Sequence, residues 1–94
     1  MSMFDLTGFQ RDLLYVIAGA DRPSGQQIKE SISDDVGEVN HGRLYPNLDT
    51  LVEKGLVVKG QHDRRTNFYQ ISDQGREAIR ARREWENQYA PFEA

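Results

Sequence analysis

Residues 42–57 read Gly-Arg-Leu-Tyr-Pro-Asn-Leu-Asp-Thr-Leu-Val-Glu-Lys-Gly-Leu-Val, and much of the architecture can be inferred from this segment. Its apolar residues at positions 44, 48, 51 and 52 follow the spacing of one buried helix face. Pro46 suits the first turn of a helix, so the helix is expected to begin near Gly42 or Arg43. Gly55 is expected to end it. The outward face would then hold Arg43, Asn47, Thr50 and Lys54.

Two shorter helices are expected upstream of this segment. Thr7 with Gln10, and Ser24 with Gln27, each form the capping-box pattern that starts a helix. Residues 19–23 should end the first helix, and the acidic residues 33–40 should form the turn after the second. One apolar face is predicted for each helix: Phe9, Leu13, Leu14, Ile17 and Ala18 in the first, and Ile28 and Ile32 in the second.

Downstream, the pattern changes from helical to strand-like and back. Residues 56–59 and 68–71 are β-branched or alternating runs on either side of the polar segment 60–67, which predicts a hairpin with a charged tip. Ser72 is expected to cap a last helix that runs towards Tyr89 and stops before Pro91. The order helix, helix, helix, strand, strand, helix predicts an α+β, mainly α, winged helix-turn-helix.

The 94 residues have the length of a single domain, residues 1–94, with a core at 7–71 and a C-terminal helix at 72–90. No apolar run reaches the ~20 residues of a membrane span, and the start lacks the pattern of a secretory signal, so we expect a cytoplasmic protein. The chain has no cysteine, which excludes thiol chemistry. No catalytic or cofactor motif is evident, so neither an enzyme nor a cofactor is expected. His41 and His62 have no carboxylate cluster at a metal-binding spacing, and no metal is predicted.

The formal net charge is −3, but the charge is unevenly distributed. Residues 1–40 hold three basic and seven acidic side chains, whereas residues 54–83 hold eight basic and three acidic ones. Such asymmetry favours a polyanionic partner on one face, although it is also found on ordinary solvated surfaces. Nine of the twelve basic residues are arginine, which together with the acidic balance resembles proteins of salt-loving archaea.

The segment 42–48 resembles the Gly-x-Leu-Tyr-Pro-x-Leu signature in the third helix of PadR-like transcriptional regulators, and Leu51 to Leu56 resembles the motif that follows it. The Arg-Arg pair at 64–65, Phe-Tyr at 68–69, Ile-Ser at 71–72 and Gly75 are similar to the wing and the last helix of the family. Residues 23–28 look like the start of its second helix. The resemblance covers roughly residues 7–80 and implies a winged-helix regulator. Gln26 and Arg43 depart from the pattern, and the C-terminal helical domain of longer members is missing, which puts their effector binding in doubt here.

A helix-turn-helix places the N-terminal side chains of its second helix on base edges, so double-stranded DNA is the expected partner. Arg43 suits a guanine and Asn47 an adenine. Tyr45 would either join them or pack under the wing, and Asn40 would either join them or only cap the helix. Arg64 and Arg65 suit phosphates or a narrow minor groove. The predicted DNA-binding residues are Asn40, His41, Gly42, Arg43, Tyr45, Asn47, Arg64, Arg65 and Asn67.

The last helix and the N-terminal arm are predicted to form a twofold homodimer, because a small core leaves several aromatic side chains uncovered. The alternative is that Trp85 folds back onto the first helix of its own chain. A dimer would present two recognition helices about one helical turn apart, which predicts an inverted-repeat operator. The predicted dimerisation residues are Phe4, Leu6, Ile79, Arg82, Trp85, Tyr89 and Phe92.

The function predicted from these features is sequence-specific transcription regulation at promoter operators. An effector, if one acts, would be an ion or a small molecule in the dimer cleft. In a saline cytosol, cations taken up between DNA and acidic side chains would offset the weakening of phosphate contacts; the candidates are Asp34, Asp35, Glu38 and Asp49. The competing interpretation is a winged helix that binds another protein and never contacts DNA. That interpretation predicts apolar side chains on the face that otherwise carries Arg43, Arg64 and Arg65.

Overall fold

The computed structural model describes residues 3–92. Residues 1–2 and 93–94 of the predicted single domain lie outside this range. The element order is the predicted one, preceded by a short 3-10 helix that the sequence pattern did not indicate. The elements are η1 (Met3–Asp5), α1 (Gly8–Ala18), α2 (Gly25–Val36), α3 (His41–Glu53), β1 (Val57–Gln61), β2 (Asn67–Ile71) and α4 (Asp73–Tyr89).

Both predicted capping boxes are present. The Thr7 hydroxyl accepts from Gln10 N at 3.2 Å while Gln10 Oε1 accepts from Thr7 N at 3.1 Å. Ser24 and Gln27 exchange the same pair of bonds at 3.1 and 2.9 Å. The prediction of a turn over residues 33–40 was wrong at its start, because α2 continues to Val36 and ends at a glycine with φ of 86°. Capping side chains mark where a helix begins, whereas its end depends on the first residue that leaves the helical region.

The predicted start of α3 was also slightly wrong. Asn40 is the N-cap and α3 begins at His41, so Pro46 is the sixth helical residue and lies beyond the first turn. The C-terminal end agrees with the prediction. Gly55 has a φ of 77°, and the N–H groups of Gly55 and Leu56 donate to the carbonyls of Val52 and Leu51. These two bonds form a Schellman motif, in which glycine is favoured because the backbone is left-handed.

The strands β1 and β2 pair in antiparallel register, with Val57 opposite Ile71 and Gln61 opposite Asn67. They extend further towards the tip than the apolar pattern predicted, because backbone pairing continues through polar residues. The loop before α2 adds a short third edge that was not predicted: Ser24 bridges Phe68, and Tyr69 N donates to the Pro23 carbonyl at 2.9 Å. The wing is therefore fastened to the start of α2.

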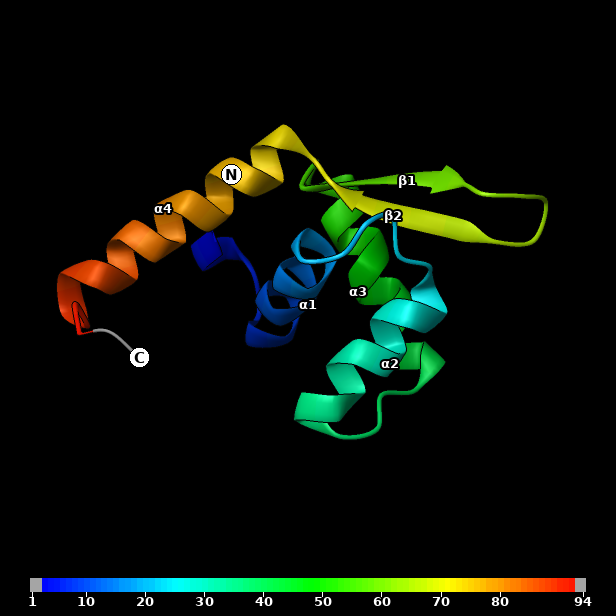
Figure 1. The fold of residues 1–94 in the computed structure, drawn as a ribbon, viewed down its shortest axis with the longest axis horizontal. Coiled ribbons are helices and arrows are strands. Elements are labelled where there is room, and N and C mark those ends of the chain that lie inside the picture. The colour runs from blue at the N-terminus through cyan, green and yellow to red at the C-terminus, as the bar shows by residue number, and fades with distance from the viewer. Residues whose placement is uncertain (1–2, 93–94) are drawn as a thin grey trace.

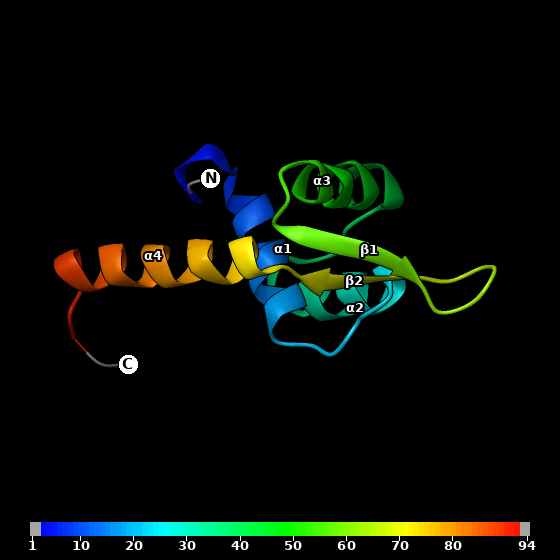
Figure 2. The ribbon, with the colours of Figure 1, turned by 90° about the horizontal axis from the view of Figure 1, so that it is seen from above.

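The three helices α1, α2 and α3 pack around one core that the hairpin covers, while α4 runs outward from the end of β2 (Figure 1). Figure 2 shows the wing tip and the far end of α4 projecting at opposite ends of the molecule. The predicted core residues of α1 are buried or half-buried except Ala18, which is exposed because it lies at the last position of that helix. The core consists of Met3, Leu6, Leu13, Leu14, Ile17, Ile28, Ile32, Val39, Leu44, Leu48, Leu51, Leu56, Val57, Tyr69, Ile71 and Ala78.

The fold is a winged helix-turn-helix, mainly helical, as predicted. Within residues 3–92, no helix is both long and apolar enough to span a bilayer.

Candidate nucleic-acid interface

The first turn of α3 is exposed and held by its cap. Asn40 Oδ1 accepts from Arg43 N at 2.9 Å, so Asn40 caps α3, one of the two roles considered for it. His41 and Gly42 follow on the exposed side of the turn. The His41 ring meets the Tyr45 ring edge-on, with centroids 5.4 Å apart. This contact links the start of α3 to the surface beside it.

Arg43 is exposed, as predicted, but its guanidinium is not free in space. Its Cζ lies 3.9 Å from the centroid of the Phe9 ring, which belongs to α1. When a guanidinium lies over an aromatic face, its N–H groups point outward in the plane of the guanidinium and can still donate hydrogen bonds. Arg43 is therefore held in place with its hydrogen-bonding edge available.

Both polar atoms of the Asn47 side chain have partners within the chain. Its Oδ1 accepts from Gln10 Nε2 at 2.9 Å, and its Nδ2 donates to the Arg43 carbonyl at 2.7 Å. The side chain is half-buried, and each polar atom of its amide makes one hydrogen bond within the chain. The outward orientation predicted for Asn47 holds only in part, because Gln10, 37 positions away, bonds its Oδ1 and covers part of the side chain. Spacing along one helix cannot reveal such a partner.

Tyr45 lies between the start of α2 and the wing. It is half-buried and lines a cleft of about 330 Å³. The structure thus places Tyr45 beside the wing, one of the two arrangements considered for it. Within the same cleft it also brings together the predicted residues Arg65 and Asn67. The other lining residues are Ser24, Gly25, Gln26, Thr66 and Tyr69.

Tyr69 was not predicted as a functional residue. Only 1% of its surface is exposed, yet it lines this cleft. Burial, and then the carboxylate of Asp49, raise the pKa of the Tyr69 phenol, so it stays protonated around neutral pH. A protonated phenol can donate a hydrogen bond into the cleft. Its place in a β-strand at the edge of the core gave no functional signal in the sequence.

The wing tip carries Arg64 and Arg65, both exposed as predicted. Its backbone is ordered by Asp63, whose Oδ1 accepts from Arg65 N and Thr66 N, each at 2.8 Å. These two bonds lower the pKa of the Asp63 carboxyl, the bond from Arg65 most. The tip therefore presents its two arginines from a fixed turn.

A small cluster around His62 packs at the start of the loop between β1 and β2. His62 Nε2 lies 3.1 Å from the Arg22 carbonyl oxygen. The centroids of the His62 and Phe68 rings are 4.8 Å apart, and Arg22 Cζ lies 5.3 Å from the centroid of the Phe68 ring. His62 thus has a structural partner. Among the described residues, no group of three His, Asp or Glu side chains is placed to hold a metal ion.

The predicted dimerisation residues differ in how far they are exposed in the single chain. Phe4 and Trp85 meet edge-on at 5.1 Å, and Trp85 and Tyr89 follow at 5.2 Å. Trp85 therefore contacts the N-terminal arm of its own chain. Tyr89 is 72% exposed and Phe92 80% exposed. Leu6, by contrast, is buried in the core of its own chain and offers no surface to a partner, so its assignment was wrong.

Trp85 and Tyr89 form the aromatic row of α4. Two further predicted dimerisation residues, Arg82 and Ile79, precede this row on the same helix. Arg82 covers both Phe4 and Trp85 with its guanidinium, at 5.5 and 4.5 Å from the ring centres, and pairs with Glu86 at 3.3 Å. Ile79 packs against the core and is half-buried. Phe4, Trp85, Tyr89 and Phe92 are the predicted dimerisation residues that stay exposed in the single chain.

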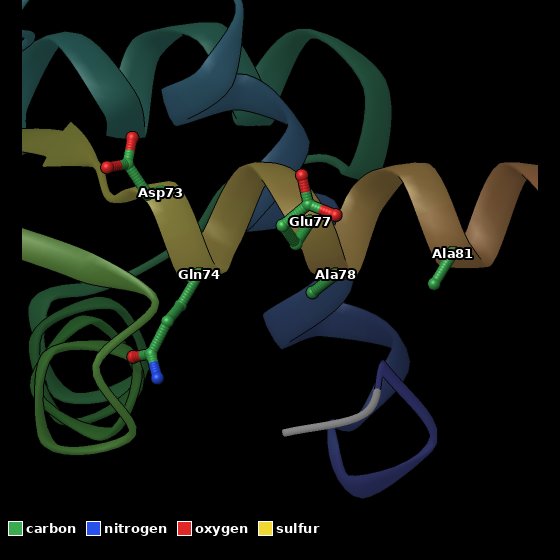
Figure 3. Close-up of a pocket in the computed structure, with 5 residues that line it drawn as sticks. All are labelled: Asp73, Gln74, Glu77, Ala78 and Ala81. Carbon is green, nitrogen blue, oxygen red and sulfur yellow. The ribbon is translucent and has the colours of Figure 1, made fainter.

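A second hollow, of about 460 Å³, runs along the first half of α4 (Figure 3). Gln74 points from it towards the turn after α3, where its Oε1 would stand 2.6 Å from a β-carbon on Gly55. Asp73 and Glu77 add carboxylates, and Ala78 and Ala81 complete the lining. Asp73 pairs with Arg76 at 3.5 Å, and Glu77 pairs with Arg80, so both carboxylates of this groove have a cationic partner.

Comparison with known proteins agrees with this geometry. Residues 13–81 match the transcriptional regulator PadR-like family. The solved structure of RosR from H. salinarum is 45% identical, with a TM-score of 0.86, over 96% of this chain and 82% of that one. A structure described as a RosR complex is 46% identical, with a TM-score of 0.86, over 92% of this chain and 77% of that one. No match is found among curated protein sequences.

A more distant structure shares the fold alone. Streptococcus pneumoniae FabT, solved in complex with DNA, is 20% identical with a TM-score of 0.74, over 96% of this chain and 62% of that one. The family match runs from the second half of α1 through α2, α3 and the wing to the first half of α4. The chain therefore belongs to the PadR-like family of transcriptional regulators and is not an enzyme.

Proposed function

We propose that this regulator binds operator DNA sequence-specifically as a homodimer, with α3 in the major groove and the wing against the backbone. One observation carries the proposal: Tyr45, Arg65 and Asn67 line one open cleft together with the start of α2. His41 extends this surface to the first turn of α3 through its ring contact with Tyr45. The recognition helix and the basic wing thus share one continuous face.

The cleft has the chemistry that a DNA phosphate requires. The N–H groups at the start of a helix attract anions, and α2 begins here at Gly25. Arg65 supplies a cation, and the buried Tyr69 phenol supplies a neutral donor. Contacts of this kind fix the position of a protein on the duplex but carry no sequence information. We therefore assign the cleft to the backbone and base reading to the first turn of α3.

Base reading falls to Arg43 in this arrangement. An arginine edge can donate to both O6 and N7 of guanine. Gly42 beside it has no side chain, and an added β-carbon there would meet only Asn40 Oδ1, at 3.4 Å. The backbone of the first turn can therefore approach the groove closely, while Arg64 at the wing tip reaches a neighbouring phosphate or the minor groove.

The exposed aromatic row on α4 supports the homodimer. Tyr89 and Phe92 leave most of their surface uncovered, and the Tyr89 ring lies beside that of Trp85. Burying such side chains in a twofold contact gains about 25 cal/mol per Å² of apolar surface. Pairing of α4 with its copy would set two recognition faces on one duplex, so the operator should be an inverted repeat.

The competing interpretation, a protein-interaction module, required apolar side chains on the recognition face. The large exposed apolar residues within residues 3–92 lie outside the cleft and the first turn of α3. They are Phe4, Tyr15, Val36, Val58, Trp85, Tyr89 and Phe92. Their placement favours DNA on the recognition face and protein on α4.

The test is a series of mobility-shift assays at increasing salt. The two DNA fragments are the promoter region upstream of the protein's own gene and a scrambled fragment of equal length. Retention of the promoter alone supports operator binding, and Arg43→Ala should then lose the preference. Equal loss on both fragments would show that Arg43 does not read sequence. If the affinity falls as salt rises, the slope gives the number of counterions displaced from DNA. If the affinity rises with salt, cation uptake is supported at the exposed carboxylates of Asp34, Asp35, Glu38 and Asp49.

A further inference from the structure

The first turn of α1 contacts the exposed end of α3 through two neighbouring side chains. The Phe9 ring lies under the Arg43 guanidinium at 3.9 Å, and Gln10 Nε2 donates to Asn47 Oδ1 at 2.9 Å. In Figure 1, α1 and α3 lie side by side in the helical body, and the two helices pack against each other. Neither Phe9 nor Gln10 is itself positioned on the cleft that faces the wing.

Gln10 is unusual among the described residues because it is the polar side chain that the core buries, with 9% of its surface exposed. Both ends of its amide are used. Oε1 accepts from Thr7 N in the capping box, so the donor Nε2 must face Asn47. The capping box of α1 thereby fixes the orientation of the amide that reaches α3.

Asn47 passes this constraint to Arg43. Because its Oδ1 accepts from Gln10, its Nδ2 is directed to the Arg43 carbonyl, to which it donates at 2.7 Å. Arg43 is thus held at two points, its backbone by Asn47 and its guanidinium by Phe9. A side chain ordered before binding loses less rotamer freedom when it meets its ligand. The stack uses the face of the guanidinium and leaves the edge for a base.

We propose that Phe9 and Gln10 are positioning residues for base reading by Arg43, and that Asn47 connects Gln10 to Arg43 and does not read a base itself. This inference rests on the proposed DNA binding. It adds that part of the sequence preference is encoded in α1, outside the helix-turn-helix. Loss of either residue should lower the discrimination between sequences more than it lowers binding to DNA in general.

The sharpest variant is Gln10→Glu. A glutamate still accepts from Thr7 N and keeps the capping box, but its second oxygen faces Asn47 Oδ1 and cannot donate to it. Asn47 would turn its amide, and the bond to the Arg43 carbonyl would be lost. Gln27→Glu is the matched control, because it adds the same charge at the equivalent capping position of α2, where the side chain bonds Ser24 of its own capping box.

Binding is measured with a duplex that the wild-type protein enriches from a random pool and with a shuffled duplex of equal composition. Gln10→Glu and Phe9→Leu should each reduce the ratio of the two affinities about three- to tenfold, the size expected for one polar or cation–π contact. Phe9→Tyr keeps the ring and should keep the ratio. Gln27→Glu should weaken both complexes alike. An unchanged ratio in Gln10→Glu and Phe9→Leu would overturn the proposal.

A second measurement works without DNA. In the free protein, the NMR resonance of the Arg43 Nε–H group should carry the ring-current shift of Phe9, and Phe9→Leu should abolish it. Absence of that shift in the wild type would overturn the positioning role even if a variant fails to fold. If the wild type enriches no sequence while the shift is present, the proposed operator binding fails and the held geometry of Arg43 stands.

Discussion

The hydroxyl of Tyr45 occupies the space that a side chain on Gly25 would need. A β-carbon on Gly25 would stand 2.6 Å from Tyr45 Oη and 2.8 Å from its Cε1. The start of α2 and the middle of the recognition helix therefore touch at a position where one partner has no side chain. This contact sets the floor of the cleft between α2, α3 and the wing.

Gly25→Ala should displace Tyr45 or open the contact between α2 and α3. Overpacking costs about 1–3 kcal/mol in a well-packed core, but Tyr45 is half-buried at an open cleft and its ring can shift, so the free energy of unfolding should fall by about 1 kcal/mol in a denaturant titration. Affinity should also fall alike for matched and scrambled DNA, because the cleft holds the backbone. Gly42→Ala is the control for stability only: a β-carbon there meets Asn40 Oδ1 at 3.4 Å, so the free energy of unfolding should change little. Equal stability of the two variants would contradict the packing argument.

The wing turn should loosen in acid. Asp63 has its pKa lowered below the usual value of 3.8 by the N–H groups of Arg65 and Thr66. A carboxylate with a lowered pKa in the folded state stabilises that state above its ordinary pKa, and the contribution is lost as the pH falls through the lower value. The amide resonances of Arg65 and Thr66 should therefore titrate together with a midpoint below 3.8. Above that midpoint, the amides of Arg65 and Thr66 should exchange faster in Asp63→Ala than in the wild type.

The two arginines of the wing tip should count as phosphate contacts. Replacing Arg64 or Arg65 with glutamine should make the salt dependence of binding shallower by about one unit of slope for each lost contact. The preference between matched and scrambled DNA should change little, because backbone contacts carry no sequence information. Arg80→Gln is a suitable control, since Arg80 pairs with Glu77 on the exposed side of α4. A change in preference without a change in slope would place the wing on the bases instead.

The aromatic row of α4 should determine the oligomeric state. Tyr89→Asp introduces a charge where the ring is 72% exposed and adjoins Trp85. Burying an unpaired charge in an apolar contact costs several kcal/mol, so sedimentation equilibrium should give the mass of one chain. Tyr89→Phe keeps the ring and should keep the dimer. A wild-type protein that sediments as a single chain at micromolar concentration would rule out this interface.

The parts of the fold that the sequence predicted well are those whose signals are local. The capping boxes at Thr7 and Ser24, and the left-handed Gly55, each act within a few residues, so their positions could be inferred from spacing. The end of α2 and the position of Pro46 within α3 were missed by small margins. In both cases several residues could have served as a boundary, and tertiary packing selects among them.

The parts that were missed depend on residues far apart in the chain. Gln10 lies 37 positions from Asn47, and Phe9 meets Arg43 across two helices. The edge between Ser24 and Phe68 likewise joins segments with no shared pattern. Residue type showed that Arg43 and Asn47 were suited to bases, but only the folded chain shows that one of them is already bonded.

The two capping boxes also have a consequence for how the chain folds. Each closes within three residues, so the starts of α1 and α2 can form before any distant segment arrives. The wing needs Val57 to find Ile71, and the edge at Ser24 needs Phe68. We therefore expect α1 and α2 to order early and the wing to order last. Destabilising substitutions in the wing should mainly speed unfolding, whereas loss of a cap should slow the folding of the whole domain.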